Sequence, residues 1–141
     1  MPGDHEAIRI VLEAFAAVES RDDARLARVC DPAVEFCWPE SLQTGRTYEQ
    51  TWDPFQPSER ERAMSPRVVA ATGDEVAVIW HQRGVNANGD WFDQEVFGLY
   101  RLRGGLLARG QMFYFDTAAV KRFLESNPPT SGRQQGKNVE K

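Results

Sequence analysis

The sequence contains little of what marks several common classes of protein. Two cysteines among 141 residues make no disulfide framework, and Cys30 and Cys37 match neither a metal-ligand spacing nor a CxxC motif. No apolar run approaches the length of a membrane span, and the first residues lack the basic and apolar segments of a signal peptide. We therefore predict a cytoplasmic protein without membrane contact, whose cysteines are small buried apolar residues.

Positive charge and metal-binding side chains are also scarce. Lys and Arg number 17 against 21 Asp and Glu, the net charge is −4, and the basic residues are scattered. Nucleic-acid binding needs clustered basic residues, so no such partner is expected. The segments "HQRG" and "FDQE" offer one histidine and scattered acids, too few ligands for a metal, and Gly104-Gly105 is not followed by the Lys of a phosphate loop. We expect no metal and no cofactor.

What the sequence does contain is the pattern of one α+β domain. Apolar spacing of three and four predicts helices over 4–19, about 23–29 and 117–126, the last with Thr117 as a candidate N-cap, and a short helix over 46–52 is plausible. Residues 127–141 hold one aliphatic and no aromatic side chain, so the domain should span 1–126 and the rest form a flexible tail. Alternating apolar residues predict strands over 33–38, 67–73, 74–85, 91–103 and 106–116.

This order of elements predicts a curved antiparallel sheet wrapped around the N-terminal helices. The concave, helix-covered side of such a sheet is a natural place for a small-molecule pocket. Which residues of the last strand face that side stays open, because either Arg109, Gln111 and Phe113 or Met112 and Tyr114 could do so.

Two segments resemble a known family. "AIRIVLEAFAAVESRDDARLARVCDPAVEF" and "YRLRGGLLARGQMFYFDTAAVKRFL" resemble the nuclear transport factor 2-like superfamily, in particular its SnoaL-like, polyketide-cyclase-like branch, over about residues 5–126. The resemblance implies a cystatin-like fold with a conical pocket. It leaves the activity open, since isomerases, dehydratases, cyclases, epoxide hydrolases and binding proteins share this fold.

The catalytic positions of the family are only partly filled. The positions that match the base carboxylate of ketosteroid isomerases are 36–38 and hold no carboxylate. The two oxyanion donors of those enzymes would fall near Ala14 or Phe15 and near Gly98, which carry no such group. Of the triad of limonene epoxide hydrolases, Arg83 alone survives. His81 matches a pocket histidine of scytalone dehydratases, although their second histidine has no counterpart.

The hairpin after residue 79 decides which side chains reach the pocket. A two-residue turn at Asn88-Gly89 would place Arg83 opposite Gln94 and His81 opposite Val96. The resemblance implies that the face with His81 and Arg83 points into the cavity. The opposite face is then an apolar patch on the outer side of the sheet, which we interpret as a homodimer interface. That patch comprises Val76, Val78, Trp80, Phe97 and Leu99.

The leading hypothesis is an isomerase, cyclase or dehydratase (a lyase) that acts by proton transfer on a small hydrophobic molecule. His81 would be the general acid/base and Arg83 the partner of an oxyanion. A structural histidine and an Arg83 salt bridge to Glu40, Asp93 or Glu95 are the alternatives, and a non-catalytic binding or dimeric scaffold domain is the alternative function. Asp116 lies at the pocket mouth or caps the last helix. The pocket lining would be completed by Trp38, Glu40, Tyr48, Gln94, Tyr100 and Asp116.

Overall fold

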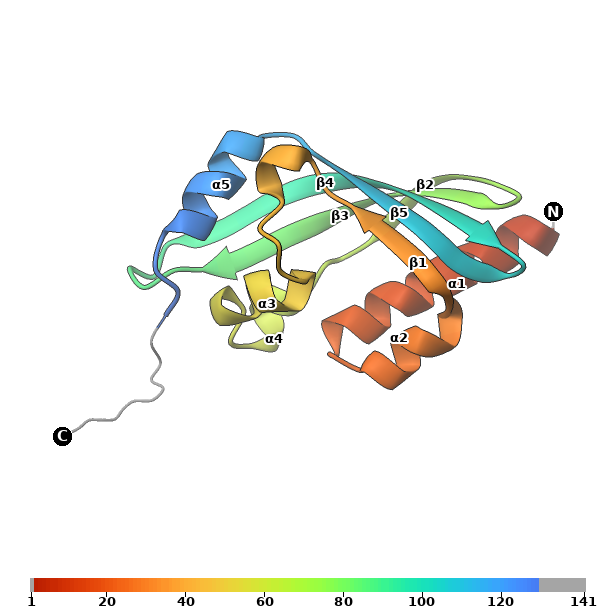
Figure 1. Cartoon of the computed structure of the whole chain (residues 1–141), viewed down its shortest axis with the longest axis horizontal. Helices are drawn as coiled ribbons and strands as arrows, with labels where there is room; N and C mark the ends of the chain where they lie inside the picture. The colour runs from red at the N-terminus through yellow and green to blue at the C-terminus, as the bar shows by residue number, and fades with distance from the viewer. Residues whose placement is uncertain (1, 130–141) are drawn as a thin grey trace.

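The computed structural model describes residues 2–129 and shows a curved sheet with helices on its concave side (Figure 1). Within these residues the sheet has five strands in the order β1-β5-β4-β3-β2. β1 runs parallel to β5, and every other neighbouring pair is antiparallel. The strands are β1 (Cys30–Cys37), β2 (Arg67–Thr72), β3 (Glu75–Val85), β4 (Trp91–Arg103) and β5 (Leu106–Tyr114).

Helices and short turns cover the concave side in two groups. α1 and α2 lie under one half of the sheet, and α3, α4 and α5 lie toward its other end (Figure 1). The apolar stripe of the first helix, including Val11 and Phe15, is buried and packs with the strands in one core. The helices are α1 (Pro2–Glu19), α2 (Asp23–Val29), α3 (Tyr48–Trp52), α4 (Glu59–Arg62) and α5 (Thr117–Glu125), with 3-10 helices η1 (Glu40–Leu42) and η2 (Asp53–Phe55). The α+β fold class is confirmed.

The turn between β3 and β4 is one residue longer than predicted. Asn86 N–H donates to Asp90 O at 3.2 Å and Gly89 N–H to Asn86 O at 2.9 Å, so three residues form the loop. Gly89 has φ +79°, which is the left-handed residue that such a loop needs. The Asn86 side chain closes the loop by accepting from the N–H groups of Asn88 and Asp90.

This turn shifts the register of the hairpin by one residue. His81 pairs with Glu95 and Arg83 with Asp93, in place of Val96 and Gln94. Because side chains alternate between the two faces of a strand, a shift by one residue changes which β4 side chains share a face with a given β3 side chain. The side chains of even number on both strands therefore share one face, and those of odd number share the other.

On β3 the face that was predicted to be inside is outside, whereas on β4 the predicted inner side chains of Val96 and Tyr100 are indeed buried. Val76, Val78 and Trp80 are at most 2% exposed and pack against the helices, so they are not part of an outer patch. His81 and Arg83 lie on the uncovered face. The reason is hydrophobic: the valine and tryptophan side chains gain more from burial than a histidine and an arginine do. The last strand follows the same rule, with Met112 and Tyr114 buried and Phe113 exposed.

The ends of the domain agree with the sequence in part. The N-cap of α5 is Asp116, one residue before the predicted Thr117, and its carboxylate accepts from Ala119 N–H at 3.0 Å. Asn127 is tied to the hairpin loop, because its carbonyl accepts from Ala87 N–H at 2.7 Å. The tail that we predicted over 127–141 lies outside the described residues from position 130 onward.

Candidate functional site

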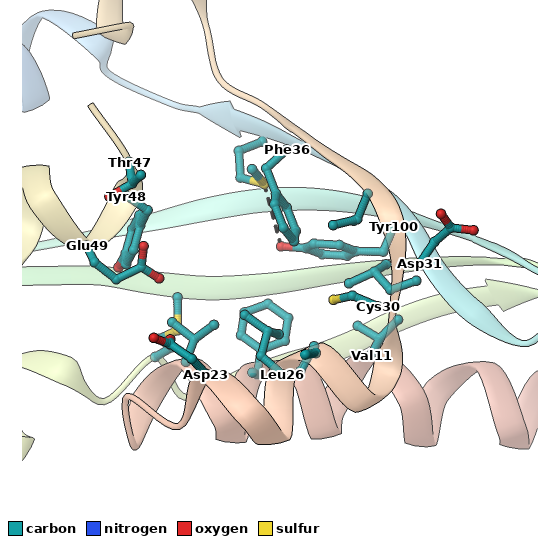
Figure 2. Close-up of a pocket in the computed structure, with 18 of the residues that line it drawn as sticks. Val11, Asp23, Leu26, Cys30, Asp31, Phe36, Thr47, Tyr48, Glu49 and Tyr100 are labelled. Atoms are coloured by element: carbon teal, nitrogen blue, oxygen red, sulfur yellow. Dashed lines mark hydrogen bonds between the residues drawn. The ribbon is translucent and has the colours of Figure 1, made fainter. Parts of the chain in front are cut away.

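The concave side of the sheet encloses a cavity of about 770 Å³ between β1, β3, β4, β5 and the helices α1 and α2. Most of its wall is apolar, with aromatic rings from several elements (Figure 2). Such a volume and lining are typical of small-molecule sites. The apolar wall includes Val11, Ala14, Phe15, Val18, Leu26, Val34, Phe36, Trp38, Met64, Trp80, Leu107 and Met112.

Tyr100 lies flat against the sheet inside this cavity. A methyl group built at Gly98 would lie 2.5 Å from Tyr100 Cε2, and one at Gly110 would lie 2.9 Å from Cε1, so both glycines are needed to seat the ring. Its hydroxyl group points into the cavity (Figure 2) and reaches Met112 Sδ at 3.8 Å. Burial raises the pKa of Tyr100 well above its usual value, so the group is a neutral donor.

Tyr48 and Trp38 form an aromatic wall at the other end of the cavity. Their rings stack with centroids 6.2 Å apart and planes inclined by 17°. Behind them lies a second hollow of about 270 Å³, which both residues also line. Burial raises the pKa of Tyr48 to about 12, so this hydroxyl too stays protonated at neutral pH.

A buried glutamine joins two tyrosines behind the cavity wall. Gln82 is 0% exposed; its Nε2 donates to Tyr48 Oη at 3.0 Å, and its Oε1 accepts from Tyr114 Oη at 2.8 Å. These two hydrogen bonds give both ends of the Gln82 amide a partner and fix the Tyr48 ring. Buried polar groups of this kind set side-chain positions when all their bonds are made.

Three carboxylates line the cavity, and two of them are unpaired. Asp31 accepts from Ala33 N–H at 2.8 Å, pairs with Arg103 at 3.5 Å and points away from the cavity's centre (Figure 2). Asp23 and Glu49 lie on the Tyr48 side (Figure 2). Neither of these two makes a side-chain hydrogen bond or an ion pair with any residue in the range 2–129. Cys30 also lines the cavity, and burial raises the pKa of its thiol, which keeps it a weak nucleophile.

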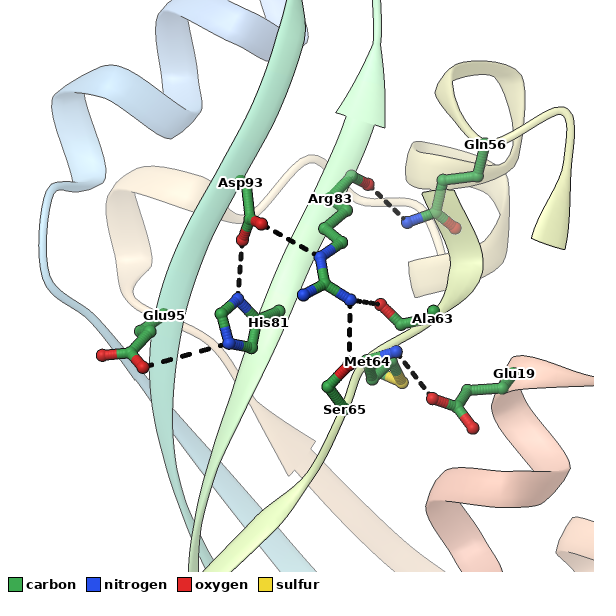
Figure 3. A network of polar contacts seen from close by, with 9 residues as sticks. All are labelled: Glu19, Gln56, Ala63, Met64, Ser65, His81, Arg83, Asp93 and Glu95. Atoms are coloured by element: carbon green, nitrogen blue, oxygen red, sulfur yellow. Dashed lines mark hydrogen bonds and ion pairs between the residues drawn. The ribbon is translucent and has the colours of Figure 1, made fainter. Parts of the chain in front are cut away.

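His81 and Arg83 do not reach the cavity but belong to a polar network on the outer face of the sheet (Figure 3). Asp93 lies between them, 2.7 Å from His81 Nδ1 and 3.1 Å from Arg83 Nε. The Arg83 guanidinium also donates to Ala63 O at 2.7 Å and Ser65 Oγ at 3.0 Å. The network fastens the segment before β2 to the sheet, which agrees with the structural alternative for both residues.

The other predicted lining residues separate into two groups. Trp38, Tyr48 and Tyr100 line the cavity. Glu40 is exposed at the start of η1. Gln94 instead holds the backbone of residue 116, because its Oε1 accepts from that N–H at 3.2 Å and its Nε2 donates to that carbonyl at 3.4 Å. Asp116 caps α5 and does not lie at the pocket mouth, so the second of the two interpretations given for it describes the structure.

Four residues of the cavity and its wall were not predicted from the sequence, namely Trp80, Gln82, Asp23 and Glu49. For the first two a signal existed, since Val76, Val78 and Trp80 make the more apolar face of β3 and a helix-covered face should be the more apolar one. For the two carboxylates no signal existed. Each lies in the first turn of a short helix, and only the tertiary fold brings α2 and α3 to the same cavity.

Residues 2–129 contain neither a cluster of three metal-binding side chains nor a helix that could span a membrane. No group of three His, Cys, Asp or Glu side chains within residues 2–129 is placed to hold a metal ion. No helix in the same range is long and apolar enough to cross a membrane. Both cysteines are free, Cys30 buried and Cys37 half-buried.

Comparison with solved structures identifies the class of fold. A protein of cystatin-like fold from Xanthomonas campestris is 22% identical with a TM-score of 0.65, over 84% of this chain and 97% of that one. TerC, solved with polyporic acid, is 18% identical with a TM-score of 0.67, over 86% and 99%. A protein named as a SnoaL-like polyketide cyclase from Jannaschia sp. CCS1 is 18% identical with a TM-score of 0.66, over 91% and 97%. These likenesses define an NTF2-like fold.

The family follows from the sequence itself. A family model for the SnoaL-like domain matches residues 11–110, which is more than half of the chain. The protein therefore belongs to the SnoaL-like family of the NTF2-like superfamily, as the two quoted segments predicted. No curated protein sequence matches the chain.

Proposed function

We propose that the protein binds a flat hydrophobic molecule, aromatic or polyketide-like, in the cavity and catalyses an isomerisation, cyclisation or dehydration by proton transfer. The observation that carries this proposal is the cavity of about 770 Å³, which combines an apolar wall with neutral tyrosine hydroxyls and unpaired carboxylates. An apolar wall selects a hydrophobic molecule, and acids and bases of different strength allow a proton to be moved.

Aromatic residues support a flat ligand. The stacked Trp38 and Tyr48 rings offer a planar surface at one end, and Phe36 faces the Tyr100 hydroxyl across the middle (Figure 2). Rings of this kind bind planar apolar molecules through large contact areas. The complex of TerC with polyporic acid supports the same class of ligand, since that protein shares the fold.

Glu49 is the base of the proposed reaction. It is half-buried beside Tyr48, lines the cavity and has a carboxylate free of partners in the described range. Glu49 takes the place of His81, which we expected to be the general acid/base, because His81 and its expected partner Arg83 lie on the other side of the sheet. The tyrosine hydroxyls supply hydrogen bonds to the substrate, because their raised pKa keeps the proton in place.

A generic probe of base catalysis tests this role. Nitrobenzisoxazole opens with a change in absorbance when a base removes its ring proton, and an apolar pocket with a free carboxylate accelerates it. We expect turnover by the wild type and a loss of about 10²-fold in Glu49→Gln, because a general base contributes about 10²–10⁴-fold. Glu40→Gln is the matched control, since Glu40 lies outside the cavity, and should retain full activity.

The same experiment separates the enzyme from a binding protein. The position of the family's base lies on β1, where Phe36 is apolar, and this observation favours the non-catalytic alternative. Equal rates with wild type and Glu49→Gln would remove the base from the proposal. Binding of apolar rings without any acceleration would leave the ligand-binding function alone.

A second copy of the chain is the partner that we propose for the outer face. Ile79, Phe97 and Phe113 are direct cross-strand neighbours, and with Leu99 they form what we call the outer patch. Phe97 and Phe113 are 40% and 46% exposed, with ring centroids 6.0 Å apart. A continuous apolar row on an uncovered sheet face favours association.

A further inference from the structure

One polar atom in the wall of the cavity has no partner. Trp80 is 2% exposed, and its indole Nε1 is the single buried side-chain nitrogen or oxygen, among residues 2–129, without a hydrogen bond. Native structures satisfy nearly all buried donors, so an exception needs a physical explanation. Trp80 lines the cavity from the central part of β3, which is where a bound molecule would supply what is missing.

A second donor with a poor acceptor lies next to this indole. The Tyr100 hydroxyl reaches Met112 Sδ at 3.8 Å, and a thioether is a weak acceptor. Burial raises the pKa of Tyr100 and the neighbouring Trp80 N–H lowers it, although the geometry of that contact falls short of a hydrogen bond. The two donors therefore form a connected pair whose outer end, the Tyr100 O–H, faces the cavity (Figure 2).

The position of the pair is fixed by the fold. Tyr100 can lie flat because Gly98 and Gly110 carry no side chain beneath it. Phe15 contacts both rings, with centroids 6.0 Å from Trp80 and 5.5 Å from Tyr100. Donors that are held before the ligand arrives lose little entropy on binding, and in an apolar site each hydrogen bond is strengthened.

We propose that the Trp80–Tyr100 pair is a receptor for one carbonyl, quinone or enolate oxygen of the ligand. The Tyr100 O–H donates a hydrogen bond to that oxygen, and the Tyr100 oxygen accepts one from the Trp80 N–H. Both donors are then satisfied when the ligand is bound. This inference rests on the proposed ligand-binding function and narrows it: the molecule carries an oxygen acceptor on its apolar body and places it against the sheet, away from the Glu49 side.

Fluorene and fluorenone test the pair, because they share a flat apolar shape and differ in one carbonyl oxygen. Calorimetric titration of the whole chain should show fluorenone binding about 10-fold more tightly, which corresponds to about 1.4 kcal/mol. Tyr100→Phe should remove this preference, and Trp80→Phe should reduce it about 3-fold, because the Tyr100 hydroxyl then loses the donor behind it. Affinity for fluorene should not change in either variant.

Tyr114→Phe is the matched control. It also removes a buried tyrosine hydroxyl, but one that bonds Gln82 and does not line the larger cavity, so the preference for fluorenone should persist. The infrared carbonyl stretch of bound fluorenone gives a readout without any variant and should move to lower frequency than in an apolar solvent.

The outcomes distinguish the two proposals. If fluorene and fluorenone bind the wild type equally, with no shift of the carbonyl stretch, the donor pair is refuted and the apolar ligand site stands. If neither compound binds, the proposed function fails, and the donor pair fails with it.

Discussion

Replacing Gln82 with leucine removes the centre of the buried polar chain and keeps the approximate size of the side chain. The amide is 0% exposed and bonds Tyr48 at 3.0 Å and Tyr114 at 2.8 Å. Without it the Tyr114 hydroxyl, on a side chain 8% exposed, loses the acceptor of a buried hydrogen bond. An unsatisfied buried group of this kind costs about 1–3 kcal/mol.

The two other contributions are smaller and of opposite sign. Loss of the bond to Tyr48 costs about 1 kcal/mol, because that hydroxyl borders the cavity and water can replace the amide. The additional apolar area of leucine returns about 1 kcal/mol. We therefore expect Gln82→Leu to lower the free energy of unfolding by about 2 kcal/mol, or the melting temperature by roughly 7 °C for a domain of this size.

Urea unfolding followed by tryptophan fluorescence measures the change, and a double-mutant cycle tests its cause. Adding Tyr114→Phe removes the orphaned hydroxyl, so Gln82→Leu should cost about 1–2 kcal/mol less in that background. Gln111→Leu on the outer face of β5 is the control and should stay within about 0.5 kcal/mol of the wild type. Additive effects of the two substitutions would refute the reasoning.

Three other predictions concern the outer network, the seat of Tyr100 and the outer patch. Burial raises the pKa of Asp93, but the hydrogen bonds from His81 and Arg83 outweigh it and bring the pKa below its ordinary 3.8. Its stabilisation is therefore present above that pH and lost as the pH falls further, and acid unfolding of Asp93→Asn should show a weaker pH dependence than the wild type. Gly98→Ala should lower the free energy of unfolding by about 2 kcal/mol, since the new methyl group overlaps Tyr100, and it should cost much less in a Tyr100→Val background, where that ring is absent. In sedimentation velocity we expect a dimer that Phe97→Lys dissociates and Phe115→Lys, on a side chain 94% exposed outside the patch, does not; a wild-type monomer would contradict the proposed interface.

The local chemistry of the chain determined its elements. Val11 and Phe15 recur at helical spacing and bury one stripe of α1, and alternation of large apolar residues marks each strand, because a side chain's direction within an element depends only on its own backbone. The same local patterns, together with the quoted segments at both ends, were enough to predict the α+β class and the SnoaL-like family. Tyr48, Tyr100 and Trp38 could be chosen as lining because aromatic residues with polar tips suit such a cavity.

The tertiary structure alone decided the register of the hairpin, and with it which β4 residues share a face with His81 and Arg83. The Asn86–Asp90 segment can close as a two-residue or a three-residue loop, so local preferences leave the register open. The difference of one residue depends on Gly89 adopting a left-handed conformation and on the Asn86 side chain closing the loop. Burial of Val76, Val78 and Trp80 under the helices is a sum over many distant contacts, which no short stretch of sequence contains. The same long-range packing brings Asp23 and Glu49 to one cavity and leaves His81 and Arg83 on the opposite face.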